Sequence, residues 1–419
     1  MLRASSRRLT LTEFAKMEAV RLTSEECDAL RVLYPEMRVE PSRGSSSHYD
    51  LTPTQRIGIL CLPNLVVEVR PKIDMPAVLF LVSYACEVAE WFDAQPDLSS
   101  GGEVVEMLAI IYARLVERTT RRGLLAGYLE EDDALQAPRG RIRFEEQLRR
   151  RFLMAPPVEV RHDVFTTDIL ENRLLLAALI ALVRLPSLSA VAQREVARAQ
   201  RLLGGVMRAH FAPSAVPAVV LTRLNHHYEA AVTLARVLLQ AAALDLGAGS
   251  AQGVAFLIDM NTVFEKFVRR ALRASLGASE GEFPNKAPLS HMDEARQVAL
   301  KPDLSWVVGG RIVWVGDAKY KRLSEQASPN ADLYQMLAYE IALGLPTGTL
   351  IYAADKGITS AEHVVANCGK HVRVVALDLN APPKAVLGRV AEIAAMIREE
   401  VGGKTPRESR PASGLAGFN

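Results

Sequence analysis

Apolar and polar residues alternate in short runs over the first seventy or so positions. Ile57 to Leu62 and Leu65 to Val69 are two such runs, and the dipeptide Pro63-Asn64 between them is typical of a turn. Residues 41–47 are also rich in turn-forming residues. The pattern predicts a small β-rich module over residues 1–74.

From residue 75 to about residue 240 the apolar positions recur with helical spacing instead. The predicted helices cover residues 75–92, 104–119, 167–183, 191–208 and 228–243. One segment, 123–161, interrupts them, because 127–129 and 140–144 have the pattern of strands. We therefore predict a mainly helical scaffold over residues 75–245 that carries a β insertion at 123–161.

A stretch of small residues at 246–253 has the composition of a linker or loop and precedes a region with a different pattern. Beyond it we expect helices over 261–276, 332–343 and 383–401, and strands over 298–308, 311–320, 349–353 and 372–377. These elements predict a mixed α/β domain at 254–401. The polar tail 402–419 is rich in Gly, Pro and Ser, and we expect it to be disordered. The fold class expected for the chain is therefore mixed α/β.

Composition adds little to this division of the chain. At 419 residues, 49% of them hydrophobic, the chain is long enough for two or three domains, and its net charge of +2 gives no global sign of a nucleic-acid binder. Any such binding must come from local patches. The densest basic cluster lies in the insertion and is either a solvated face or a surface that faces phosphate or protein. It consists of Arg139, Arg141, Arg143, Arg149, Arg150 and Arg151.

Three further features bear on location. The longest apolar stretch, Pro76 to Cys86, falls short of the roughly 20 residues that span a bilayer. The basic N-terminus is not followed by a long apolar run, which argues against a secretory signal and leaves an organellar presequence as a weaker alternative. The 4 cysteines are scattered, without a C-x-x-C pair or a nearby His at ligand spacing. We expect a cytoplasmic protein with reduced cysteines and no membrane contact.

The most informative stretch for chemistry runs from Lys301 to Lys319. Asp303 precedes an apolar run, Gly309-Gly310 indicates a hairpin turn, and Asp317-Ala-Lys319 lies in the second run. Alternate residues of a strand share a face, so Asp317 and Lys319 point the same way. Two carboxylates that converge form a site for Mg²⁺, which prefers hard oxygen ligands, with Mn²⁺ as a possible substitute.

The register of the hairpin decides whether Asp303 reaches that face. A two-residue loop pairs Asp303 with Gly316 and turns Asp317 to the opposite face. A three-residue loop pairs Asp303 with Asp317 and also sets Trp306 opposite Trp314, a favourable aromatic pair. We predict the three-residue loop, or a bulge that has the same effect.

Two predicted helices supply further polar side chains. Gln335 and Tyr339 are four residues apart and share a helix face, from which an amide and a phenol could reach DNA or a metal-bound water. Glu265 lies on a helix side that also carries Val268 and Leu272. Its carboxylate is either a satisfied edge group or a third acid that faces the site.

In chain order these motifs resemble the PD-(D/E)xK nuclease superfamily, in the form that also has a Q-x-x-x-Y helix, as in RecB-like and Cas4-like nucleases. The motifs are Glu265, Pro302-Asp303, Asp317-x-Lys319 and Gln335-x-x-x-Tyr339. The Cas4-like proteins also carry an iron–sulfur cluster held by cysteines that flank the nuclease, whereas Cys368 stands alone here. The resemblance implies a restriction-endonuclease-like α/β domain that cleaves DNA with Mg²⁺.

The same resemblance implies a role for each motif residue. Asp303 and Asp317 would hold one or two Mg²⁺ ions, with the backbone carbonyl of Ala318 as an extra ligand. Lys319 would orient the attacking water or stabilise the charge that develops on the phosphate. Glu265 would complete the acidic site.

Gln335 and Tyr339 would position the substrate, which the resemblance implies to be double-stranded DNA. The sequence contains no G-x-x-x-x-G-K-[ST] phosphate loop, so we expect no nucleotide site in this protein.

Four further segments resemble the McrC family, the nuclease subunit of modification-dependent restriction systems that are typically specific for 5-methylcytosine. They are 259–268, 69–73, 140–142 and 171–173. The resemblance implies a partner, a separate AAA+ GTPase motor subunit that recognises methylated DNA and whose GTP hydrolysis the N-terminal half stimulates. Residues 1–245 would bind this motor, with the arginine cluster and Arg70-Pro71-Lys72 as candidate contacts.

Two other functions are compatible with the motifs. One is a stand-alone RecB-like DNA repair or recombination nuclease. The other is a regulatory adaptor that activates a partner GTPase through a vestigial nuclease fold. The retention of Asp303, Asp317 and Lys319 argues against the second, because a vestigial site has no reason to keep all three chemical types.

Overall fold

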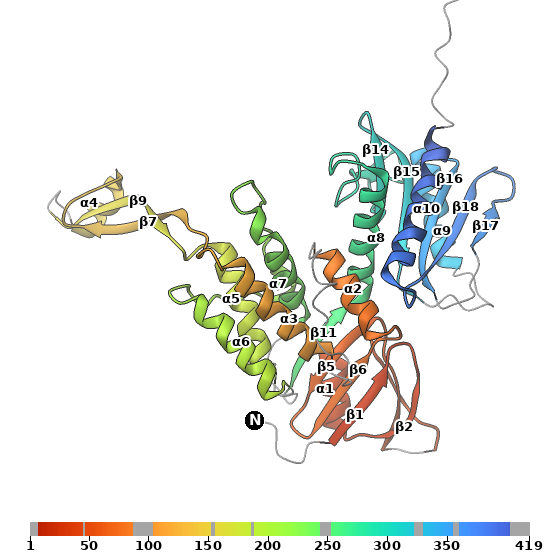
Figure 1. Cartoon of the computed structure of the whole chain (residues 1–419), viewed down its shortest axis with the longest axis horizontal. Coiled ribbons are helices and arrows are strands. Elements are labelled where there is room, and N and C mark those ends of the chain that lie inside the picture. The colour runs from red at the N-terminus through yellow and green to blue at the C-terminus, as the bar shows by residue number, and fades with distance from the viewer. Residues whose placement is uncertain are drawn as a thin grey trace, which may run out of the picture. The chain divides into compact units, whose positions relative to one another are not determined.

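The computed structural model describes residues 7–44, 47–86, 104–151, 156–185, 188–243, 253–321, 330–354 and 360–402. The chain divides into two compact units (Figure 1). The first unit comprises Met1–Lys72 and Cys86–Asp259, and the second comprises Ile73–Ala85 and Met260–Asn419. Within the described ranges both units mix helices with small sheets, which confirms the mixed α/β class. No helix in those ranges is long and apolar enough to cross a membrane.

The N-terminal part of the first unit contains two sheets and one helix. The five-stranded sheet has the order β1 (Arg7–Thr12), β6 (Leu65–Arg70), β5 (Arg56–Cys61), β11 (Val254–Asp259) and β10 (Ala242–Ala243). The three-stranded sheet has the order β2 (Met17–Arg21), β4 (His48–Thr52) and β3 (Arg38–Pro41). Leu11, Leu30, Leu51 and Val67 join both sheets and the helix α1 (Ser24–Leu33) in one buried core.

The hydrophobic pattern did not predict two elements of this unit, the helix α1 and the strand β11. The helix α1 is marked by a capping box, because Thr23 accepts a hydrogen bond from the Glu26 N–H at 3.1 Å and donates its own N–H to the Glu26 carboxylate at 2.9 Å. The strand β11 lies after the predicted linker, yet it pairs antiparallel with β5. Residues 254–259 therefore complete the first unit's sheet and do not begin the C-terminal domain, where the sequence-based division had placed them.

The helical part of the first unit follows the predicted pattern closely. It contains α3 (Val104–Thr119), α5 (Leu170–Val183), α6 (Ala190–Leu202) and α7 (Glu229–Ala241). The helix α5 packs against α6 and α7, and α3 packs against α6 (Figure 1). The predicted linker at 246–253 lies outside the described residues except for Gly253, and so does the predicted tail except for Gly402.

The insertion forms a three-stranded antiparallel sheet with one helix. The strands have the order β7 (Gly127–Leu135), β9 (Val158–Thr166) and β8 (Arg141–Ile142). The strand predicted at 140–144 is shorter than expected, because Phe144 begins the helix α4 (Phe144–Arg151), which has acidic residues in its first turn and basic residues in its last.

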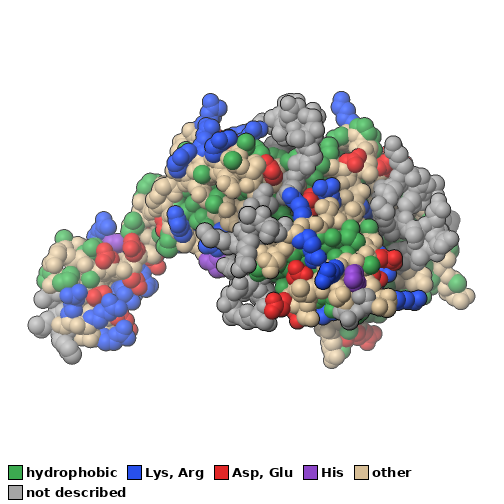
Figure 2. Space-filling model, turned by 90° about the horizontal axis from the view of Figure 1, so that it is seen from below, with side chains coloured by type: hydrophobic (Ala, Val, Ile, Leu, Met, Phe, Trp, Pro, Cys, Tyr) green, Lys and Arg blue, Asp and Glu red, His purple; other side chains and the backbone are tan. Residues whose placement is uncertain are grey.

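This helix also changes the interpretation of the arginine cluster. Arg149 and Arg150 pair with Glu146 at 2.9 and 3.2 Å, and Arg151 pairs with Glu159 at 3.6 Å. Arg143 pairs with Asp132 at 3.1 Å. In Figure 2 the Lys and Arg side chains of this part alternate with Asp and Glu. Most of the cluster is therefore neutralised within the insertion, as expected for a solvated face.

The second unit is built on one mixed sheet. Its strands have the order β14 (Leu304–Val308), β15 (Arg311–Lys319), β16 (Thr347–Ala354), β18 (His371–Asp378) and β17 (Ala361–Val364). The three central strands are parallel, and the two outer strands are antiparallel to their neighbours. The predicted strands in this region are present, apart from a break between β13 (Ala299–Leu300) and β14.

Helices cover both faces of this sheet. On one face α9 (Asn330–Leu343) packs Met336 and Tyr339 against Val315, Leu350 and Tyr352 of the central strands. On the other face lie α8 (Met260–Leu276) and α10 (Pro383–Gly402).

A helix from far upstream also belongs to the second unit. The helix α2 (Met75–Ala85) was predicted to be part of the scaffold, but it packs on α8, with the Phe80 and Phe267 ring centroids 5.3 Å apart. Arg270 fixes the end of α2 by donating to the carbonyl of Ala85 at 2.9 Å. Helical spacing identified this helix but could not show which unit it joins.

Candidate functional site

The hairpin of β14 and β15 sets the register of the candidate site. Val308 pairs with Arg311, so the loop is the two-residue turn Gly309-Gly310, in which both φ angles are positive at +57° and +78°. The three-residue loop is therefore wrong, but the alternative of a bulge is confirmed. Trp306 faces Trp314 and Val307 faces Ile312, so Val313 is the additional residue.

The bulge restores the alignment of the two acids. Leu304 pairs with Gly316, and the same register one residue further places Asp303 opposite Asp317. The Asp303 Oδ2 atom accepts a hydrogen bond from the Ala318 N–H at 3.3 Å, which fixes the carboxylate against the partner strand. The structure thus brings the two predicted acids together on the sheet face that α9 covers.

Burial makes this pair electrostatically unusual. Asp317 is 1% exposed, and desolvation together with the neighbouring charge and hydrogen bond of Asp317 raises the pKa of Asp303 to about 7. When Asp303 carries a proton it can share it with Asp317. When both groups are ionised, two negative charges face each other away from water, an arrangement that favours a bound cation.

Lys319 completes this group. Its ammonium forms an ion pair with Asp317 Oδ2. Burial alone would lower the pKa of Lys319, but the charges of Asp317, Asp303 and Asp332 outweigh it, so the pKa is raised above its usual value. A protonated lysine therefore lies beside the two acids, where it can donate to an oxygen of a substrate phosphate.

The donor set fits a hard divalent cation. Both carboxylate oxygens of Asp317 are buried, and their ionisable neighbours are the Lys319 ammonium and the Asp303 carboxyl group. The described residues contain no cluster of three or more acidic, His or Cys side chains that could hold a metal. Two carboxylates, with a strand carbonyl such as that of Ala318 as a further candidate, would offer oxygen ligands, which suit Mg²⁺ or Mn²⁺ better than a softer ion.

The predicted Gln335 and Tyr339 pair lies beside this group. The Gln335 amide donates to the Tyr339 hydroxyl at 2.8 Å, and that hydroxyl donates to the Lys301 carbonyl at 3.2 Å. Gln335 is exposed, whereas Tyr339 is only 5% exposed. Tyr339 therefore ties α9 to the segment that carries Asp303, and Gln335 is the member of the pair that can face a substrate.

Glu265 lies close enough to Asp303 to interact with it electrostatically. Burial, followed by the charge of Asp303, raises the pKa of Glu265, while Arg269 opposes the shift. The Glu265 carboxylate forms an ion pair with Arg269, the residue one helical turn further along α8. Arg269 was missed in the sequence, where the only sign of it was this i, i+4 spacing.

A second network that the sequence did not reveal lies next to Lys319. Asp332 is 4% exposed. Its carboxylate accepts hydrogen bonds from the Tyr352 hydroxyl at 2.6 Å and from the Lys321 ammonium at 2.9 and 3.0 Å. Tyr352 lies on the neighbouring strand β16 and Asp332 at the start of α9. The network anchors the end of β15 to α9 and adds a negative charge near Lys319.

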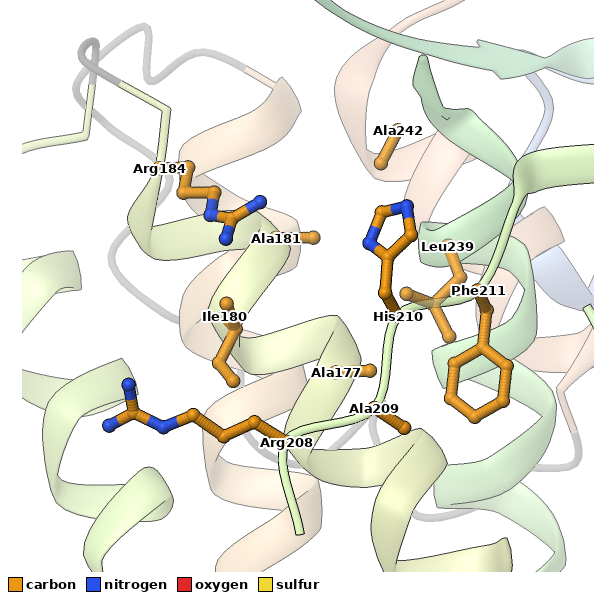
Figure 3. Close-up of a pocket in the computed structure, with 10 residues that line it drawn as sticks. All are labelled: Ala177, Ile180, Ala181, Arg184, Arg208, Ala209, His210, Phe211, Leu239 and Ala242. Atoms are coloured by element: carbon orange, nitrogen blue, oxygen red, sulfur yellow. The ribbon is translucent and has the colours of Figure 1, made fainter. Parts of the chain in front are cut away.

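A pocket in the first unit has different chemistry. It encloses about 170 Å³ between α5, α7 and the segment around His210 (Figure 3). Its polar side chains are Arg184, Arg208 and His210, and the rest of its lining is apolar. Its described lining residues include no carboxylate, so its chemistry differs from that of the Asp303 and Asp317 pair.

Comparisons with known proteins identify a family and a similar fold. A family model described as "McrBC 5-methylcytosine restriction system component" matches residues 51–353. No curated protein matches the chain. A chain in the refined half-complex from the tetradecameric assembly of Thermococcus gammatolerans McrB AAA+ hexamers with bound McrC is similar in fold. It is 16% identical, with a TM-score of 0.51, and the match covers 92% of this chain and 100% of that one.

A second solved structure is also similar. It is the cryo-EM structure of the Thermococcus gammatolerans McrBC complex, 17% identical, with a TM-score of 0.43, and the match covers 64% of this chain and 88% of that one.

Proposed function

Because the chain belongs to the family of McrBC 5-methylcytosine restriction system components, we propose that it is the Mg²⁺-dependent DNA endonuclease subunit of such a system. One observation carries the nuclease part of the proposal. Asp303, Asp317 and Lys319 converge on one face of a β-hairpin, with both acids largely buried and the lysine in an ion pair with Asp317. Two acids and a lysine so arranged suit metal-assisted hydrolysis of a phosphodiester.

Each residue of the site has a distinct task in this proposal. Asp303 and Asp317 would hold Mg²⁺ or Mn²⁺, and the Ala318 carbonyl would add a ligand. When bound, the ion supplies Lewis-acid polarisation of the scissile phosphate and lowers the pKa of a bound water. Lys319 donates a hydrogen bond to the attacking water or to the phosphate oxygen on which charge develops. Its raised pKa keeps that proton available.

The remaining motif residues support this centre. Tyr339 holds the Lys301 carbonyl, two residues before Asp303, and Gln335 presents an exposed amide to the DNA backbone. Glu265 adds a third acid beside Asp303, and its carboxylate forms an ion pair with Arg269.

The partner part of the proposal rests on the family and on the matched fold. The assembly that contains the first matched structure has McrB AAA+ hexamers with bound McrC. We infer that this chain likewise acts with a separate AAA+ GTPase motor, which it stimulates, on double-stranded DNA that carries 5-methylcytosine. The first unit is then the motor-binding part, and the second unit the cleaving part.

Plasmid cleavage by the reconstituted complex tests the proposal. With the motor subunit, GTP and Mg²⁺, the wild-type chain should linearise methylated plasmid, whereas Asp317→Asn and Lys319→Met should each reduce the rate by about 10²-fold or more. Both variants should still stimulate GTP hydrolysis. Glu392→Gln, which changes an exposed acid on α10, should cleave normally.

Three results would point elsewhere. Near-normal cleavage by a folded Asp317→Asn chain would remove the site assignment. Cleavage of unmodified DNA without the motor or nucleotide would favour a stand-alone nuclease. Stimulation of GTP hydrolysis with no cleavage by the wild-type chain would favour a regulatory adaptor.

A further inference from the structure

Arg269 on α8 makes two contacts of different kinds beside the acid pair. Its Nε and Nη2 atoms both donate to the backbone carbonyl of Asp303, at 3.2 and 2.8 Å. Its Nη2 atom also forms an ion pair with Glu265. One guanidinium therefore joins the main chain of a proposed metal ligand to a carboxylate on the same helix.

The location of Asp303 makes this contact important. The ladder between β14 and β15 begins at Leu304, so Asp303 lies one residue beyond the last paired position. Its side chain is held by the Ala318 N–H at 3.3 Å, and the carbonyl of Lys301 is held by Tyr339 from the opposite face. Arg269 supplies the contact from the α8 side, and it acts on the backbone of Asp303 itself.

Arg269 does not have the exposure that direct contact with DNA requires. It is only 8% exposed, and three of its donor contacts are made inside the protein. A planar guanidinium that donates two hydrogen bonds to one carbonyl restricts the position of that carbonyl more than an ammonium does, because the directions of its hydrogen bonds are fixed. Glu265 restricts it further, because the ion pair fixes which way the guanidinium faces.

We propose that Arg269 is a positioning residue, oriented by Glu265, that sets the metal affinity of the site by holding the Asp303 main chain so that its carboxylate meets that of Asp317. This inference rests on the proposed function, because it takes Asp303 and Asp317 to be the metal ligands. Arg269 itself touches neither metal nor substrate. Its removal leaves Asp303 free to turn away from Asp317, which weakens binding of the ion without removing either ligand.

Calorimetric titration of the isolated chain with Mn²⁺ tests this without requiring cleavage. Arg269→Met should weaken Mn²⁺ binding by about tenfold or more, the effect expected when a charge-assisted hydrogen bond to a ligand's support is lost. Arg269→Lys keeps the charge but loses the fixed pair of donors that the guanidinium directs at one carbonyl, and should bind Mn²⁺ with intermediate affinity. If Arg269→Met does not fold, the comparison of Arg269→Lys with the wild type decides.

Arg273 offers a matched control on the same helix. It also donates to a backbone carbonyl, that of Phe283 at 2.9 Å, but it has no contact with the acid pair. Arg273→Met should leave the Mn²⁺ affinity within about twofold of the wild type, on the same tenfold scale of affinity. Equal weakening by Arg273→Met and Arg269→Met, or wild-type affinity in Arg269→Met, would overturn the inference.

A parallel titration of Asp317→Asn separates this inference from the proposed function. Loss of Mn²⁺ binding in Asp317→Asn, together with unchanged binding in Arg269→Met, would overturn only the role of Arg269. Undiminished Mn²⁺ binding in Asp317→Asn would overturn the metal site and the inference with it. Excess Mg²⁺ should also restore cleavage by Arg269→Met, since both ligands remain, but not by Asp317→Asn.

Discussion

Trp306 faces Trp314 directly across the β14–β15 hairpin, although the loop between the strands has only two residues. The pairing is possible because Val313 is bulged out of the ladder, and the same bulge places Asp303 opposite Asp317. Trp314 is 1% exposed and stacks on Phe283 with the ring centroids 6.2 Å apart. The buried indole and the acid pair are therefore consequences of one register.

The register can be tested by changing the chain length at two points. Deletion of Val313 removes the bulge. The hairpin can then keep either its two-glycine turn or the pairing of Trp306 with Trp314 and of Asp303 with Asp317, but not both. We expect lost Mn²⁺ binding and a free energy of unfolding lower by about 3 kcal/mol or more, as for a misplaced core aromatic residue. Insertion of one glycine between Gly309 and Gly310, both exposed, should leave Mn²⁺ binding intact. Equal loss in both variants, measured by calorimetry and urea unfolding, would contradict this account.

The Tyr339 hydroxyl gives a second prediction. Tyr339→Phe leaves the Lys301 carbonyl without its partner, and we expect a stability loss of about 1 to 2 kcal/mol together with slower cleavage. Urea unfolding and cleavage rates of the reconstituted complex measure both effects. Tyr334→Phe removes a hydroxyl from an exposed tyrosine on the same helix and should change neither. Wild-type stability and rate in Tyr339→Phe would show that this hydrogen bond does not position Asp303.

The acid pair predicts how the metal requirement depends on pH. Burial and the charge of Asp317 raise the pKa of Asp303 to about 7, and a carboxylate must lose its proton before it can bind a cation. Protons therefore compete with Mg²⁺ below this pKa. The Mg²⁺ concentration that gives half-maximal cleavage should fall about tenfold between pH 6 and pH 8. A requirement that stays constant over this range would mean that Asp303 is ionised throughout.

Glu340 on α9 predicts a separate effect of pH on stability. Its side chain is fully buried, and burial raises its pKa to about 7 despite the opposing charge of Lys370. Between the ordinary pKa of a glutamate and about 7, the folded state therefore binds more protons than the unfolded state. The free energy of unfolding falls as the pH rises through this window, and the whole contribution of Glu340 is lost above it.

Glu340→Gln mimics the protonated form and removes this dependence. At pH 8 we expect the variant to be more stable than the wild type by about 1 to 3 kcal/mol, with a much smaller difference near pH 5. Urea unfolding at both pH values measures the difference. Glu399→Gln, at an exposed position on α10, serves as the control. A gain in stability for Glu340→Gln that is the same at both pH values would exclude ionisation of Glu340 as its cause.

The sequence contained enough to predict the acid pair but not the means by which it is assembled. For Asp303 to share a face with Asp317 and for Trp306 to pair with Trp314, the hairpin must contain one residue more than a two-residue turn allows. Nothing in the pattern showed that this residue is Val313 and that it lies within the strand, because bulge position depends on packing from both faces of the sheet. Helix periodicity likewise placed Gln335 and Tyr339 on one face, while the carbonyl that Tyr339 binds became visible only in three dimensions.

Non-local pairing explains the remaining differences. The strand β11 reads as an apolar run after a linker, and only its pairing with β5 assigns it to the first unit. Arg269 is four residues from Glu265, which is visible in the sequence, but its two hydrogen bonds to Asp303 join positions 34 residues apart. Such contacts arise from the packing of α8 on the sheet, for which local patterns carry no information.

The most direct test of the metal centre is a crystal structure of the intact chain with Mn²⁺. The crystals would be grown with Mn²⁺, and the data measured at a wavelength that gives an anomalous signal from manganese. We predict an anomalous peak within coordination distance of both Asp303 and Asp317, about 2.2 Å from their oxygens, and its disappearance in Asp317→Asn. A peak elsewhere in the chain, or no peak at saturating Mn²⁺ with both carboxylates still facing each other, would contradict the account.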